Sequence, residues 1–97
     1  MGIDLLDVAF RLERRFRVKI SRDQLAKLVM RNEPPDIRVG DLFDFIRSEI
    51  PRVGVLDFEL DADVLWPMFQ REISDGLGVS ADEVTKDKGL IHDLGAG

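Results

Sequence analysis

The sequence predicts one all-α domain built from three long helices and one short helix. Apolar residues recur at spacings of three and four in four separate segments, which is the pattern of a buried helical face. The stretches that alternate apolar with polar residues, 16–20 and 57–61, are too short to predict a sheet. The 97 residues have room for one modest core, so residues 1–97 are expected to form a single domain.

The first helix is expected from about Ile3 to Phe16. Asp4 and Asp7 stand near its start and Arg14 and Arg15 near its end, where the helix dipole favours negative and positive charge respectively. Its buried face is formed by Leu5, Val8, Ala9, Leu12 and Phe16. The alternation after Phe16 predicts an extended connector.

The short second helix is expected to begin after Ser21, a good N-cap residue. Its apolar residues are Leu25, Leu28 and Val29. Residues 32–36 break the chain, because two consecutive prolines cannot continue a helix.

The third helix is expected to open at Val39-Gly40-Asp41, with Asp41 as a plausible cap, and to end at Pro51. Its apolar residues are Leu42, Phe43, Phe45, Ile46 and Ile50. The acidic residues 51–62 that follow are interpreted as a linker.

The last helix is expected to begin near Asp63 and to stop at Gly76 and Gly78. Its apolar face consists of Leu65, Phe69, Ile73 and Leu77, and Trp66 is expected to anchor it together with Phe69. Pro67 is tolerated if it falls in or near the first turn. Residues 79–97 are expected to form a structured loop with local caps at Ser80, Asp82 and Thr85.

Composition excludes several kinds of chemistry. The chain has no cysteine, which removes disulfides, thiolate metal sites and a cysteine nucleophile. The one histidine, His92, has no nucleophile beside it and is expected at the surface. We therefore expect neither catalytic residues nor a metal site, and the protein is not expected to be an enzyme. No apolar run approaches the length of a membrane span, so a cytoplasmic protein is expected.

Charge is unevenly distributed along the chain, whose net charge is −5. Residues 1–50 carry 10 basic and 9 acidic groups, whereas residues 51–97 carry 4 basic and 10 acidic groups. Seven basic residues cluster in one stretch: Arg11, Arg14, Arg15, Arg17, Lys19, Arg22 and Lys27. A nucleic-acid partner is not expected, because the chain is acidic overall and shows no interleaved stacking aromatics. This stretch instead indicates a solvated face or a partner with acidic patches.

Two parts of the chain resemble acyl carrier proteins, but in the opposite order along the sequence. Residues 77–85 (LGVSADEVT) and 93–96 (DLGA) are similar to the end of that family's first helix and to its long first loop. Residues 3–13 (IDLLDVAFRLE) and 16–21 (FRVKIS) are similar to its second helix and the exit from it. Residues 38–46 (RVGDLFDFI) are similar to the start of its last helix.

Joining residue 97 to residue 1 would restore the family's order. Residues 1–50 then correspond to family helices two to four, and residues 63–97 to helix one and the first loop. The resemblance implies a four-helix acyl-carrier-like bundle that is circularly permuted. A domain swap, in which residues 63–97 of one molecule complete the bundle of another, is equally compatible, so a monomer and a swapped dimer both remain open.

The resemblance implies a carrier in fatty-acid, lipid or polyketide-type biosynthesis that meets acyl-transfer or synthase-type enzymes. The cofactor it implies is 4′-phosphopantetheine, but Gly2 stands where the family has the serine that carries this group, and no attachment is expected. The matching loop beside that position consists of Asp93, Leu94, Gly95 and Ala96. The residues expected to contact partners are Ile3, Asp4, Leu6, Asp7, Phe10, Arg14 and Arg15. The alternative is a non-carrier interaction module of the same fold, regulatory or scaffolding.

Overall fold

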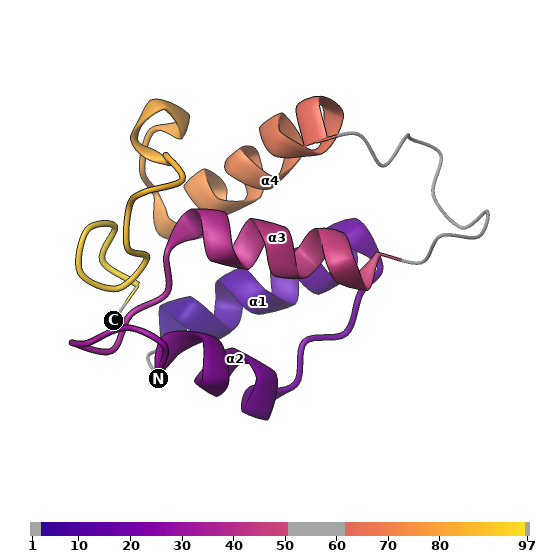
Figure 1. The fold of residues 1–97 in the computed structure, drawn as a ribbon. Coiled ribbons are helices and arrows are strands. Elements are labelled where there is room, and N and C mark those ends of the chain that lie inside the picture. Colours follow the sequence, from indigo (N-terminus) through magenta and orange to yellow (C-terminus); the bar gives the residue numbers. More distant parts are fainter. Residues whose placement is uncertain (1–2, 51–61, 97) are drawn as a thin grey trace.

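The structure, a computed structural model, describes residues 3–50 and 62–96 of the chain. Within these ranges the fold is all-helical and no strand is formed. Its elements are α1 (Ile3–Phe16), α2 (Arg22–Val29), α3 (Val39–Glu49), α4 (Ala62–Leu77) and the short 3₁₀ helix η1 (Ala81–Glu83). In Figure 1, α1 and α3 run in one direction while α2 and α4 run in the other. The predicted three long helices and one short helix are confirmed.

Helices α1 and α4 pack against each other in antiparallel fashion. Gly76, near the end of α4, lies beside Val8 and Arg11, since a Cβ at Gly76 would stand 3.2 Å from a carbon of each side chain. Arg15, one turn after Arg11 on α1, lies near Glu72, which is one turn before Gly76 on α4. The missing side chain at position 76 therefore lets the two helices approach closely.

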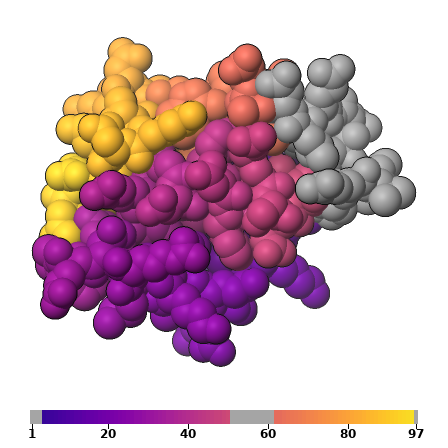
Figure 2. Space-filling view, viewed as in Figure 1, coloured from indigo at the N-terminus to yellow at the C-terminus, as the bar shows by residue number. Residues whose placement is uncertain are grey.

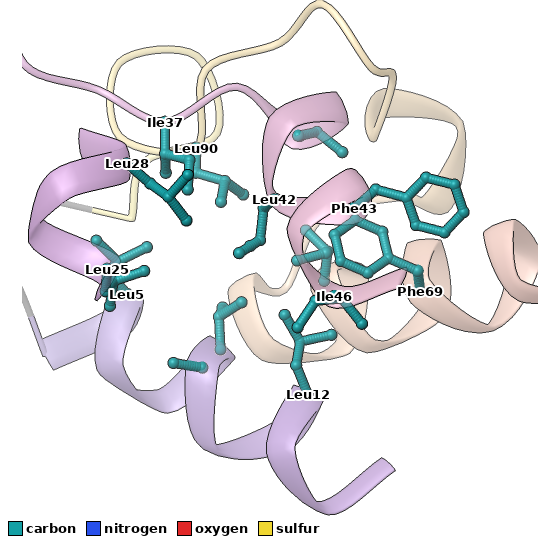
Figure 3. Close-up of a cluster of buried hydrophobic side chains, with 14 of the residues drawn as sticks. Leu5, Leu12, Leu25, Leu28, Ile37, Leu42, Phe43, Ile46, Phe69 and Leu90 are labelled. Carbon is teal, nitrogen blue, oxygen red and sulfur yellow. The ribbon is translucent and has the colours of Figure 1, made fainter. Parts of the chain in front are cut away.

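The core lies between the helices and draws on all of them. Figure 3 shows Leu5 of α1 beside Leu25 of α2 at one end of the core, and Phe43 of α3 beside Phe69 of α4 at the other. Phe43, Trp66 and Phe69 form an aromatic cluster, with ring centroids 5.1 to 5.8 Å apart. The fully buried large side chains are Phe16, Phe43, Phe69, Leu5, Leu12, Leu25, Ile37, Leu42, Ile46, Leu65, Ile73 and Leu90. The predicted buried face of α1 and the anchoring of α4 by Phe69 are confirmed.

The N-terminus of α2 has the predicted cap. The Ser21 hydroxyl accepts a hydrogen bond from the Gln24 backbone N–H at 3.1 Å, and the Gln24 side-chain oxygen accepts from the Ser21 N–H at 3.0 Å. This reciprocal arrangement is a capping box. It satisfies two of the donors that a helix start leaves without an intrahelical partner.

Helix α3 begins at Val39, as predicted, but its cap differs from expectation. Asp41 is not the cap, because the helix already begins at Val39 and Asp41 lies in its first turn. The N-cap position is Arg38, whose side chain makes no capping hydrogen bond. The first two N–H groups of the helix instead donate to backbone carbonyls of the C-terminal segment, residues 79–96. The Val39 N–H donates to the Lys88 carbonyl and the Gly40 N–H donates to the Lys86 carbonyl, each at an N–O distance of 2.9 Å. A distant backbone segment therefore replaces the local cap.

The end of α4 also differs in detail. Gly76 lies inside the helix, which continues to Leu77, and Gly78 alone ends it, with a φ of +68°. Pro67 is the sixth residue of the helix and so stands just beyond the first turn.

The C-terminal segment, residues 79–96, is folded onto the helices, as expected of a structured loop. Gln70 of α4 donates hydrogen bonds to the carbonyls of Ala81 and Val84, which fixes η1 against α4. Ser80 precedes η1 but makes no side-chain capping bond. Four apolar side chains of the segment are buried: Val84, Leu90, Leu94 and Ala96. In the space-filling view the orange-to-yellow segment lies directly against the magenta residues of α3 and the loop before it (Figure 2).

Some expectations fall outside the described residues. These are most of the linker, residues 51–61, and the positions of Gly2 and Gly97. No described helix has the length and apolar character needed to cross a bilayer.

Candidate functional site

The outward side of α1 carries most of the residues that the sequence predicts to contact partners. Asp4, Phe10, Arg14 and Arg15 are exposed, and Asp7 is half-buried. Leu6 is instead partly buried against the core, so it lies toward the inward side of α1. Ile3 is the first residue of α1, and its side chain is not among those that the structure describes. The structure thus places Phe10 and the two arginines where a partner could reach them.

The arginines of α1 differ in their ion pairing with the described residues. Arg11 pairs with Asp7 through an Nε–Oδ2 distance of 3.1 Å. Arg15 lies 3.9 Å from Glu72 of α4, which is longer than a hydrogen bond. Arg14 has no ion pair with any described residue. Among the described residues, no carboxylate therefore offsets the charge of Arg14 through an ion pair.

A surface hollow lies between α1 and α4, next to Arg14. It measures about 370 Å³ and is lined by Arg11, Arg14, Arg15 and Glu72. A neighbouring hollow of about 580 Å³ continues it along α4. Its lining residues are Arg15, Pro67, Met68, Arg71, Glu72 and Asp75. Sequence reasoning missed the α4 residues, because only the antiparallel packing brings them opposite the arginines of α1.

The residues predicted to stand beside the cofactor position, 93–96, form a closed turn. The Gly89 N–H donates to the Asp93 carboxylate at 2.7 Å, and the Ala96 N–H donates to the Leu90 carbonyl at 2.8 Å. Leu94 and Ala96 are buried, and Gly95 adopts a φ of +81°. This turn is a fixed part of the fold. Gly2, predicted beside it, is outside the described residues.

Asp36 is a buried carboxylate that sequence reasoning did not single out. Only 9% of its surface is exposed. Its oxygens accept hydrogen bonds from three backbone N–H groups, those of Ile37 at 2.7 Å, Ile91 at 2.8 Å and His92 at 3.2 Å. The carboxylate thus joins the loop before α3 to the C-terminal segment. All of its contacts serve the fold.

His92 lines a surface hollow together with Asp36, Asp87 and Asp93. His92 is exposed, as predicted, and its Nε2 lies 3.2 Å from the Pro35 carbonyl. Within residues 3–50 and 62–96, no group of three or more histidine and carboxylate side chains could hold a metal ion.

Among the described residues, the carboxyl of Asp87 has a clearly shifted pKa. The Thr85 hydroxyl donates a hydrogen bond of 2.7 Å to Asp87. This bond, together with the residue's own backbone N–H and the charges of Lys88 and Arg38, lowers the pKa of Asp87 below its ordinary value of 3.8.

The chain matches no family model, no curated protein and no solved structure at a significant level. The outward side of α1 and the adjoining hollow are therefore identified by their geometry and charge alone.

Proposed function

We propose that this chain is a non-enzymatic, carrier-type domain of the acyl carrier protein class in circularly permuted order, which meets acyl-transfer or synthase-type enzymes through α1. The observation that carries the proposal is the packing of α4 against α1 in antiparallel fashion. Read in the order α4, α1, α2, α3, the helices would correspond to family helices one to four, as the resemblance implies. The proposal also takes the protein to work in the cytoplasm.

The C-terminal segment supports the same order. It leaves α4, crosses to the start of α3 and ends in the closed turn at residues 93–96. Figure 1 draws the yellow turn at residues 93–96 on the same side of the molecule as the indigo start of α1. A loop that joined them would lead from this turn into α1, as the first loop of a carrier leads into its second helix.

The residues present do not fit covalent attachment of 4′-phosphopantetheine. Attachment requires a hydroxyl at the start of α1, and Gly2 has no side chain. The four serines of the chain lie elsewhere: Ser21 caps α2, Ser48 bonds within α3, Ser74 within α4, and Ser80 precedes η1. The chain as written is therefore proposed to act without this group.

A relinked protein tests the carrier assignment. Its chain begins at residue 62, continues from residue 97 into residue 1, and ends at residue 50, with Gly2→Ser. Coenzyme A and a broad-specificity phosphopantetheinyl transferase are added, and mass spectrometry reads the product. We expect the serine version to gain one phosphopantetheine, whereas the matched Gly2→Ala version and the natural chain gain nothing.

Three results would count against parts of the proposal. A mass gain on the natural chain would contradict an unloadable domain. A relinked serine protein that fails to fold, as judged by helical circular dichroism and Trp66 fluorescence, would contradict the permuted order. One that folds but stays unmodified would favour the alternative, a non-carrier interaction module. The basic face around Arg14 is the observation that favours this alternative.

A further inference from the structure

The surface around Phe10 and Arg14 has the features of a contact site. Phe10 is 58% exposed, although burying an aromatic ring of this size is strongly favourable. Arg14 follows one turn later on the same side of α1 and has no ion pair with a described residue. Aromatic and arginine side chains are the types that dominate binding energy at protein interfaces.

The charge next to Phe10 selects an anionic ligand. The hollow next to Arg14, one turn further along α1, is lined by Arg11, Arg14, Arg15 and one acid, Glu72. Asp7 offsets part of the charge of Arg11, and Glu72 stands 3.9 Å from Arg15. Arg14 supplies a planar guanidinium suited to a bidentate carboxylate contact.

The size of the positive region favours a protein segment over a polyanion. The arginines at positions 11–15 span about 6 Å along the helix axis. Acidic residues lie on two sides of this positive region. Asp7 is one turn earlier on α1, and Asp75 is across the neighbouring hollow. These acids and the net charge of −5 repel an extended row of phosphates. An exposed Phe10 also provides an apolar contact, which a phosphate backbone would not use.

We infer that the outward side of α1 docks an acidic protein segment. An apolar side chain of the segment covers Phe10, and its carboxylate binds Arg14 at the edge of the hollow between α1 and α4. This inference rests on the proposed function, because it names the chemistry of the partner surface that α1 contacts. The docking itself needs no carrier group.

Two fluorescein-labelled peptides of 12 residues test the inference in the 97-residue chain. One contains glutamates with two leucines four positions apart, and the other has lysine in place of each glutamate. Fluorescence anisotropy at low ionic strength measures their affinity, because charged surface contacts weaken in salt. The glutamate peptide is expected to bind, and the lysine peptide is not.

Matched variants locate the contact. Arg14→Glu is expected to weaken the glutamate peptide about tenfold, and Phe10→Ala about fivefold. The controls are Arg31→Glu and Met30→Ala, which make similar changes at exposed residues after α2. Both controls are expected to leave the affinity within about twofold. Amide chemical shifts on peptide addition are expected to change along α1, and circular dichroism verifies that each variant folds.

Several results would overturn the inference. These are no binding of the glutamate peptide, equal losses in Arg31→Glu and Arg14→Glu, or stronger binding of the lysine peptide. Binding of a 20-nucleotide single strand or of phosphatidylglycerol vesicles that depends on Arg14 and exceeds peptide binding would also contradict it, because the site would then serve a polyanion. The relinked protein reports only on the carrier assignment, so a failure of that assignment can be told apart from a failure of the docking inference.

Discussion

Asp36 shows how a single buried side chain joins distant parts of the fold. Its carboxylate accepts N–H groups from both sides of the contact between residues 36–40 and residues 86–92. Bonds to an ionised acceptor are stronger than neutral ones, and leaving buried donors without a partner is costly. The tight fit extends to Gly89, where a Cβ would collide with the Asp36 carboxylate. Glycine at position 89 is therefore required by its neighbour.

Gly89→Ala is expected to lower the free energy of unfolding by about 1–3 kcal/mol, because the added methyl displaces the Asp36 carboxylate. Asp36→Ala alone is expected to cost about 2 kcal/mol or more, since three N–H groups lose their acceptor. Urea denaturation followed by Trp66 fluorescence measures both values.

The double variant tests the coupling between these two residues. With the carboxylate removed, the methyl at position 89 has space, so the combined loss should fall clearly below the sum of the single losses. Strict additivity would show that Gly89 matters for another reason.

Thr85 is expected to control the titration of Asp87. The hydrogen bond from its hydroxyl is the leading cause of the lowered pKa of Asp87. A pKa depressed in the folded state adds stability above the unfolded value of 3.8, and this stability is lost as the pH falls through the folded pKa. Thr85→Val is expected to raise the pKa of Asp87 toward 3.8, as read from carboxyl carbon shifts in an NMR titration. Thr85→Ser, which keeps the hydroxyl, should retain the lowered pKa, and an unchanged pKa in the valine variant would contradict this account.

At the level of elements, α2 depends on its cap more than the longer helices do. It has only eight residues, and helices of this length are marginal without tertiary contacts. Its capping box and three buried residues, Leu25, Leu28 and Val29, supply the stabilisation.

Ser21→Ala is expected to lower the free energy of unfolding by about 1 kcal/mol, because the Gln24 N–H loses its acceptor. Ser48→Ala is the matched control, since that exposed hydroxyl only donates to the carbonyl of Phe45 within the same helix. Urea denaturation of the two variants compares them. Equal losses would show that the cap contributes nothing specific.

The helix boundaries show which features of the fold could be predicted from local sequence patterns. The bounds of α1 and the cap at Ser21 were predicted correctly, because local charge, periodicity and capping chemistry determine them. The start of α3 at Val39 was also predicted, but its cap was not, since backbone carbonyls of Lys86 and Lys88 accept its first N–H groups from far along the chain. The sequence likewise could not show that Gly76 is a helix contact, because that role exists only once α1 lies beside it.

For the whole molecule, the packing of α4 on α1 of the same chain predicts a monomer. Light scattering should give a mass near 11.0 kDa across a range of protein concentrations. A swapped dimer, in which α4 packs on another copy, would give twice this mass. A concentration-independent dimer would therefore contradict the intramolecular packing.

The sequence by itself determined the all-helical class, most helix bounds and most of the core. These follow from apolar spacing, caps and breaks that act within a few residues. It also located the basic stretch around Arg14. Only the tertiary structure decided which residues face these arginines, how α3 is completed and why Asp36 is buried. Each of these depends on pairs of residues far apart in the chain, such as Arg15 with Glu72, whose meeting is fixed by helix packing and leaves no local pattern.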